Sequence, residues 1–140
     1  MRHKKKGRKL NRTASHRKAL MMNMALALIS NKRIQTTDAK AKELRPYIER
    51  LISYAKKGDL HGRRLILRKL SGSSGKNAAN VLIHEIAPAC KDRNGGYARI
   101  IKLNNRKNDN APVSLIELVD FAGASEVEPT PTEEKSEKTE

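Results

Sequence analysis

The side chains with the clearest chemistry are the cations of the first eighteen residues. Nine lysines and arginines lie there, and the chain has no acidic residue before Asp38, so they cannot all be paired within the segment. Guanidinium groups bind phosphates through two parallel hydrogen bonds, and lysine ammonium groups act as point charges. The segment therefore predicts an arm that binds a polyanion; the alternative is a solvated basic segment without a partner. The nine residues are Arg2, Lys4, Lys5, Lys6, Arg8, Lys9, Arg12, Arg17 and Lys18.

Two weaker features could add contacts with phosphate. His16 suits a contact with a phosphate or a base, and equally a packing role at the start of a helix. Arg63, Arg64 and Arg68 fall in a predicted helix, where Arg64 and Arg68 share one face. That face is a candidate phosphate surface, and plain solvation is the alternative.

The segment DRNGGY, at residues 92–97, is the third candidate contact region. Its two adjacent glycines allow a positive φ or a close approach of the backbone to a ligand. An ordinary turn into a strand is the alternative. The predicted contacts are Arg93, Gly95, Gly96, Tyr97 and Arg99, with Arg106 and Lys107 in the loop that follows.

The aromatic residues separate the kinds of nucleic-acid binder. Proteins that bind single strands stack successive bases on interleaved aromatic side chains. This chain has only three tyrosines and one phenylalanine, and none of them lies in the basic arm. Recognition of phosphates and shape in folded, double-helical RNA fits better, although composition alone does not separate RNA from DNA.

No catalytic or metal-binding pattern is present in the sequence. It has no GxxxxGK[ST] phosphate loop, no HExxH and no GxSxG. The four histidines are 13, 45 and 23 positions apart, so none form a short ligand pair, and the single cysteine, Cys90, cannot form an internal disulfide. We therefore expect no enzyme activity, no cofactor, no metal site and a reducing compartment.

Length and charge bound the architecture. The chain has 140 residues, 30 Lys and Arg against 15 Asp and Glu, and a net charge of +15, so one domain with tails is expected. Residues 126–140 carry six Glu against two Lys, which leaves a still more basic body. This acidic end has low hydrophobicity and predicts disorder, serving either solubility or electrostatic autoinhibition of the basic surface.

The apolar run ALMMNMALALI, at residues 19–29, raises the question of a targeting signal. It is too short to span a bilayer, Asn23 interrupts it, and no small-residue cleavage site follows, which argues against a secretory signal. A mitochondrial transit peptide remains an alternative because the segment is basic, poor in acid and amphipathic.

Hydrophobic periodicity predicts seven elements. We expect a broad apolar face from Ala19 to Ile29 on the first helix, and Leu60, Leu65 or Ile66, and Leu70 turned inward on the third. Gly58 is expected just after the second helix and Asp59 as the cap of the third. The apolar face expected on the second helix consists of Leu44, Ile48, Leu51, Ile52 and Ala55. Pro46 could kink the second helix, SGSSG at residues 71–75 predicts a flexible loop, and Pro88 predicts the end of the fourth helix. The elements are a helix at 13–30, a strand at 33–36, helices at 38–57, 59–70 and 77–86, and strands at 97–103 and 113–120, the last two pairing antiparallel.

This order, α-β-α-α-α-β-β, predicts a two-layer α+β domain with a small sheet covered by helices. We expect an extended basic RNA-binding arm at residues 1–12, an α+β RNA-binding domain at 13–121 and a disordered acidic tail at 122–140.

Taken together, these motifs resemble the bacterial large-subunit ribosomal protein seventeen family. The resemblance spans roughly residues 1–120, in the family's order. It rests on MRHKKKGRKLNRTASHRKALMMNM at 1–24, RIQTTDAKAKELRPYIERLI at 33–52, HGRR at 61–64, RNGGYARIIKL at 93–103 and APVSLIELV at 111–119.

The resemblance implies a structural constituent of the large ribosomal subunit that binds ribosomal RNA near the nascent-chain exit and supports translation in the cytoplasm. Its partners would be that RNA and neighbouring large-subunit proteins, with no membrane, small-molecule substrate or homo-oligomer. The family's RNA-facing arm corresponds to Arg2, His3, Lys4, Arg8, Lys9, Arg12, His16 and Arg17, and its GGY turn to Gly95, Gly96 and Tyr97, with Arg93 and Arg99 beside it. A free nucleic-acid-binding regulator or chromosome-compacting protein is the alternative.

Overall fold

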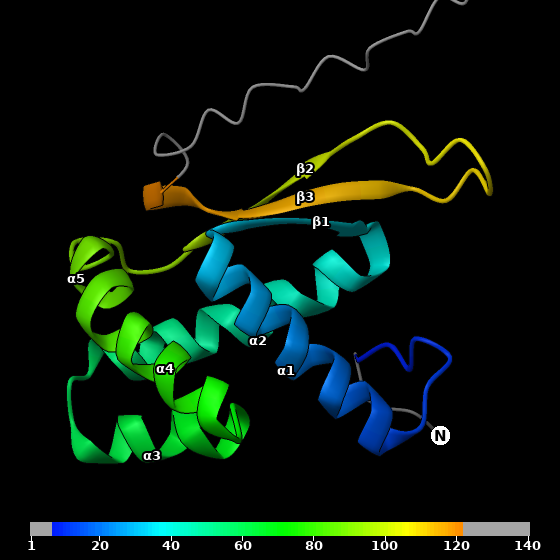
Figure 1. The fold of residues 1–140 in the computed structure, drawn as a ribbon. Helices are drawn as coiled ribbons and strands as arrows, with labels where there is room; N and C mark the ends of the chain where they lie inside the picture. The colour runs from blue at the N-terminus through cyan, green and yellow to red at the C-terminus, as the bar shows by residue number, and fades with distance from the viewer. Residues whose placement is uncertain (1–6, 122–140) are drawn as a thin grey trace, which may run out of the picture.

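The computed structural model describes residues 7–121, which form an α+β domain (Figure 1). The expected α+β class is confirmed and the order of elements roughly matches, with a π turn and a short helix added before the second strand and a 3-10 turn after the third. The elements are α1 (Ala14–Asn31), β1 (Arg33–Thr37), α2 (Asp38–Lys56), α3 (Leu60–Lys69), α4 (Ser73–Val81), a π-helical turn (Leu82–Ile86), α5 (Ala87–Ala89), β2 (Ala98–Lys102), β3 (Val113–Leu118) and a 3-10 turn (Val119–Phe121).

The three strands form one antiparallel sheet in the order β1-β3-β2. The expected pairing of the last two strands is confirmed, and β1 adds to the other side of β3. Ile34, Ile116 and Ile100 lie opposite one another across the sheet, on the face that the helices cover. Figure 1 shows the sheet as one layer with the helices on one side of it, so the domain has two layers.

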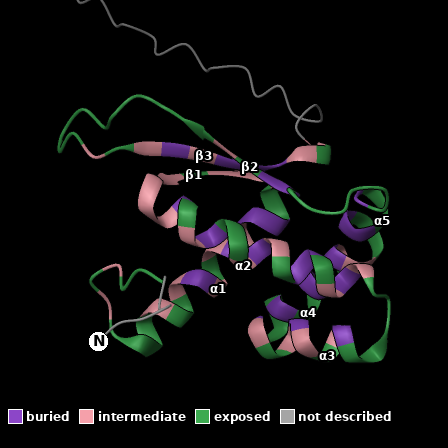
Figure 2. Ribbon diagram, turned by 180° about the vertical axis from the view of Figure 1, so that it is seen from behind, coloured by how far each residue is buried: buried purple, intermediate pink, exposed green. Residues whose placement is uncertain are grey.

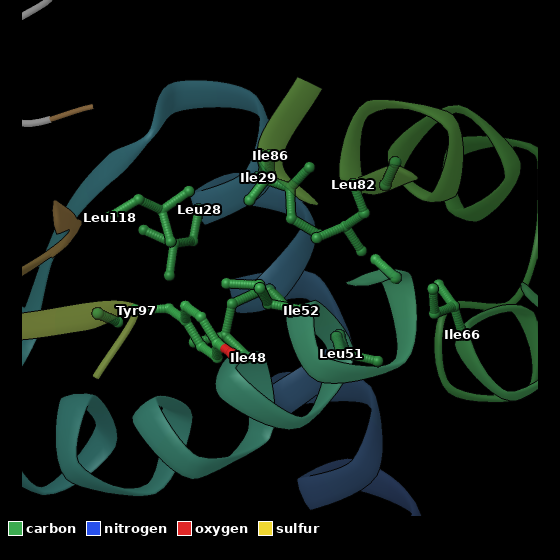
Figure 3. Packing of buried hydrophobic residues seen from close by; sticks show 14 of the residues in the cluster. Leu28, Ile29, Ile48, Leu51, Ile52, Ile66, Leu82, Ile86, Tyr97 and Leu118 are labelled. Carbon is green, nitrogen blue, oxygen red and sulfur yellow. The ribbon is translucent and has the colours of Figure 1, made fainter. Parts of the chain in front are cut away.

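The core lies between the sheet and the helices, and α2 runs through its centre. α2 contacts α1, α3, α5 and all three strands. Its apolar residues recur every three or four positions, and the predicted face is buried as expected: Leu44, Ile48, Leu51, Ile52 and Ala55. In Figure 3, Leu28 and Ile29 of α1, Leu82, Ile86, Tyr97 and Leu118 surround Ile48 and Ile52. Each fully buried Leu or Ile contributes roughly 1.5–3 kcal/mol of transfer free energy.

The junction between α2 and α3 follows the sequence signals. Gly58 has a φ of +66°, the left-handed conformation of a glycine just after a helix, and Asp59 caps α3 by accepting a hydrogen bond from the Gly62 amide at 2.6 Å. Pro46 lies inside α2, which continues unbroken from Asp38 to Lys56. Leu60 is 63% exposed at the first position of α3, so the expectation that it points inward is wrong; Leu70 is buried as expected.

The segment SGSSG does not form a flexible loop. α4 begins at Ser73, directly after Gly72, and Gly75 is buried against the backbone of Leu70. The helical path then continues through Pro88 to Ala89, so the expected end before this proline is also wrong. The Ala87 amide bonds to the Leu82 carbonyl five residues earlier, and this wider π turn lies immediately before Pro88, whose ring crowds a regular α-helix.

The first helix buries most of the apolar face that its sequence predicts. α1 buries Met21, Ala25, Leu28 and Ile29, but Ala19 is exposed. Residues 1–6, which hold the first half of the predicted arm, and residues 122–140, the predicted acidic tail, lie outside the described residues. No helix within residues 7–121 is long and apolar enough to cross a membrane.

Candidate nucleic-acid interface

The described part of the chain carries far more positive than negative charge. It holds 24 of the 30 Lys and Arg residues and 9 of the 15 Asp and Glu residues. Even if every carboxylate bound a different cation, most cations would have to find another anion. Where the few carboxylates lie therefore determines which cations are available for phosphate.

Residues 7–12 fold back on the domain, which differs from the expected extended arm. Leu10 and Asn11 both have positive φ angles, near +50°, and form a turn. The Arg8 amide donates to Glu43 Oε1 at 3.3 Å, and the Arg8 Nε lies 3.8 Å from the same oxygen. The segment folds back because it binds the Glu43 carboxylate on α2, which the sequence of the arm itself does not reveal.

Arg17 holds this turn in place. Its Nη1 donates to the Arg12 carbonyl at 3.2 Å and to the Lys9 carbonyl at 3.5 Å, and the side chain is half-buried. Arg12 Nη1 donates a hydrogen bond to His16 Nε2 at 2.7 Å, which ties the turn to the first turn of α1. Of these predicted RNA contacts, Arg17 and His16 therefore also have structural roles.

A hollow of about 630 Å³ lies between residues 7–10, α1 and α2. Arg8, Lys9, Arg17 and Lys18, all predicted from the sequence, lie around it. The residues that α2 contributes to this hollow are not among the contacts predicted from the sequence. Glu43, Pro46, Tyr47 and Arg50 are spaced at helical intervals, and this periodicity could have identified them as one face.

The α3 residues form a separate basic surface. Arg63 donates to the Asn80 side chain at 2.8 Å and is half-buried, while Arg64 and Arg68 are exposed. Figures 1 and 2 place α3 at the end of the molecule opposite residues 7–12 and the loop between β2 and β3. The structure therefore does not bring Arg63 and Arg64 together with the N-terminal cations.

At the DRNGGY turn, one glycine has the expected positive φ, but the predicted contact Tyr97 is buried in the core. Gly96 has a φ of +66°. Tyr97 is only 5% exposed, packs in the core, and receives a hydrogen bond from Lys56 Nζ at 3.3 Å on its hydroxyl. Arg93 pairs with Asp120 at 3.1 Å. Contact of Tyr97 with RNA stays a prediction, and the exposed members of the predicted set here are Arg93, Gly95, Gly96 and Arg99.

Asp120 connects this turn with the single cysteine. Burial raises the pKa of the Cys90 thiol to about 12, and the neighbouring Asp120 carboxylate adds to the shift. The pKa of Asp120 is lowered in turn, first by its hydrogen bond with Cys90 and then by Arg93. Cys90 is therefore a protonated thiol of the core at neutral pH, not a nucleophile.

The remaining predicted arginines are bound to carboxylates of the sheet and its loop. Arg99 on β2 pairs with Glu117 on β3, which is 4% exposed. Arg106 forms two hydrogen bonds with Asp109, at 2.9 and 2.8 Å, and this contact lowers the pKa of Asp109. Lys107 is exposed in the same loop, which Figure 2 shows as largely exposed.

Among residues 7–121, no three His, Cys, Asp or Glu side chains gather as they would to hold a metal ion. The arrangement offers exposed cations in several places, which is suited to binding an extended polyanion at many points. Each phosphate bound in this way contributes through counterion release, so affinity depends steeply on salt.

Comparison with known proteins gives a consistent result. The family model described as "Ribosomal protein L17" matches residues 20–119. The chain is 50% identical over 136 residues to a protein of Akkermansia muciniphila named "Large ribosomal subunit protein bL17", covering 95% of this chain and 98% of that protein. It is 52% identical over 120 residues to a protein of the same name from Allorhizobium ampelinum, covering 86% of this chain and 83% of that protein.

Proposed function

Since the chain belongs to the ribosomal protein L17 family, we propose that it is a structural constituent of the large ribosomal subunit and binds ribosomal RNA there. The observation that carries the proposal is the excess of cations over carboxylates in the described residues. A protein with this balance is stabilised by a polyanion that neutralises its self-repulsion. Its role in translation is to bind and brace RNA, and no catalytic step is required.

The structure suggests how the surface divides this work. Lys9, Lys18, Arg64 and Lys107 are exposed and have no hydrogen-bonded carboxylate partner among residues 7–121, so they are open to phosphate. Arg8, Arg93, Arg99 and Arg106 each contact a carboxylate. Binding of phosphate by these four requires exchange of the carboxylate or sharing of the guanidinium. We therefore rank the first set as the stronger contributors to affinity.

The charges of residues 1–12 extend the proposed interface, and we assign them to phosphates of the same RNA. The six Glu of residues 126–140 oppose binding if they reach this surface. A location near the nascent-chain exit, with other large-subunit proteins as neighbours, is part of the same proposal and rests on the family.

Sucrose-gradient fractionation of cell extracts tests the proposal. The expected result is that the protein sediments with the large subunit and remains there after a high-salt wash. Recovery mainly in free or DNA-bound fractions would instead support a regulator or a chromosome-compacting protein. Crosslinking of this chain to a stalled nascent polypeptide checks the location near the exit, and exclusive crosslinks to the subunit interface would contradict it.

A further inference from the structure

We propose that the hollow between residues 7–10, α1 and α2 is a pocket for one unpaired nucleotide that projects from a folded RNA. The inference rests on the proposed function as an RNA-binding protein and adds a specific ligand for one part of its surface. The pocket volume of about 630 Å³ lies within the range of roughly 300–1,000 Å³ that small-molecule sites occupy.

Charge around the pocket selects an anion. Five cations surround it, Arg8, Lys9, Arg17, Lys18 and Arg50, against the single carboxylate of Glu43. Glu43 is already engaged by the amide and side chain of Arg8. The net excess of positive charge therefore remains available to the phosphates on either side of a nucleotide.

The same pocket is lined by apolar groups that suit a base. Leu10, Met21, Pro46 and Tyr47 contribute to its wall. The Tyr47 hydroxyl donates to the Lys69 carbonyl at 3.2 Å, and this hydrogen bond holds the ring in one position. Aromatic rings and guanidinium planes are the usual stacking partners of unpaired bases in RNA complexes.

The shape of the pocket depends on the folded-back segment. The left-handed conformations of Leu10 and Asn11 turn the chain, and Arg17 binds two carbonyls of the turn. Left-handed conformations at residues other than glycine are uncommon and are often found at ligand sites. The arrangement places the wall of residues 7–10 opposite α2, with the hollow between them.

A concave site discriminates between forms of RNA. A paired base is held inside its helix and cannot enter the hollow, whereas an unpaired base leaves the helix at low cost. A flat basic surface would not make this distinction, because it contacts only the phosphates that both forms present.

The test compares two RNA probes on the full-length protein by fluorescence anisotropy at fixed salt. One probe is a 20-base-pair RNA duplex, and the other is the same duplex with one bulged uridine. We expect the wild-type protein to bind the bulged probe about tenfold more tightly, a factor that corresponds to about 1.4 kcal/mol and lies within the range for stacking of one base.

Two variants of α2 provide the matched comparison. Arg50→Gln removes a cation that lines the pocket, and Arg45→Gln removes an exposed cation of the same helix that does not. Both weaken total RNA binding through one lost charge, but only Arg50→Gln is expected to reduce the preference for the bulge, to about threefold or less. Tyr47→Leu keeps apolar bulk but removes the aromatic ring. Provided that its circular dichroism spectrum matches that of the wild type, this variant should reduce the preference for the bulged probe in the same way.

The outcomes separate the pocket from the proposed function. If the protein binds neither probe, the proposed function is overturned along with the pocket. If it binds both probes equally, the pocket is wrong and RNA binding stands. A preference for the bulge that survives both Arg50→Gln and Tyr47→Leu also overturns the pocket.

Discussion

Substitution of Gly75 by alanine tests the most unexpected part of the fold, the start of α4. A Cβ at this position would lie 2.6 Å from the carbonyl carbon of Leu70, closer still to its oxygen, and 3.3 Å from its Cβ. The obstacle is mainly backbone, so it cannot be relieved by rotating a side chain. Either the first turn of α4 or the fully buried Leu70 must move.

The magnitude follows from two opposing effects. Overpacking of a well-packed core costs about 1–3 kcal/mol, and contact with backbone places Gly75→Ala at the upper end. Alanine recovers about 1 kcal/mol because it favours a helix more than glycine does. The expected net loss is about 2 kcal/mol, a fall of roughly 1 M in the urea midpoint for an m value of about 2 kcal/mol/M.

Gly95→Ala is the matched control. An added Cβ at Gly95 meets nothing within 4 Å, and its φ is not in the left-handed region. Reduced entropy of the unfolded chain should leave this variant unchanged or stabilised by up to about 1 kcal/mol. A flexible segment around residue 75 would give Gly75→Ala the same small gain. Urea denaturation followed by circular dichroism therefore distinguishes the two by sign, and a Gly75→Ala protein as stable as wild type refutes the packing.

Three further predictions follow from the ion pairs and the buried thiol. Arg99→Gln leaves the buried carboxylate of Glu117 without its guanidinium and should cost about 1–3 kcal/mol in urea denaturation; an unchanged midpoint would show that the pair adds nothing. The pKa of Asp38 is lowered chiefly by its hydrogen bond with Lys42. The ionised Asp38 carboxylate therefore contributes its full share to folding stability above the unfolded pKa of about 3.9, and this share is lost as pH falls through the lower pKa of the folded state. Asp38→Asn should therefore lower the Tm at pH 7 and have little effect near pH 2, and a difference that grows on acidification would contradict this. Cys90 is 2% exposed with a pKa of about 12, so iodoacetamide at pH 8 should modify it only in urea, and rapid labelling of the native protein is the opposing result.

The elements that the sequence predicts best are those governed by local rules. The periodicity of Leu44, Ile48, Leu51 and Ile52 identifies one face of α2 without any knowledge of what packs on it. Asp59 caps a helix through an amide three residues away, which is equally local. Both predictions are confirmed because the interacting groups are close in sequence.

Predictions that rest on residue types that usually interrupt a helix fare worse. A glycine-rich and serine-rich segment is typical of a loop, but here α4 begins within it at Ser73, and Gly75 packs against the backbone of Leu70. A proline ends most helices, but the π turn before Pro88 allows this helical path to continue. Neither circumstance is visible in the residues themselves.

The candidate interface divides in the same way. Residue type correctly indicates where positive charge lies, but the acidic partners of Arg8 and Arg99, Glu43 and Glu117, are 35 and 18 residues away. Such pairs depend on the packing of the N-terminal segment on α2 and on the register of β2 with β3. The sequence therefore identifies the cations and leaves open which of them are already occupied.

The order of strands in the sheet governs when the fold can be completed during synthesis. β1 and β2 are both edge strands, and each bonds only to β3, which is the last strand to be translated. All of α1 to α5 have been translated once the chain reaches Ala89, so these helices can pack before β3 is available to pair with β1 and β2. A chain whose synthesis stops before Val113 therefore contains α1 to α5 and no sheet, and the domain is completed only once β3 has been translated.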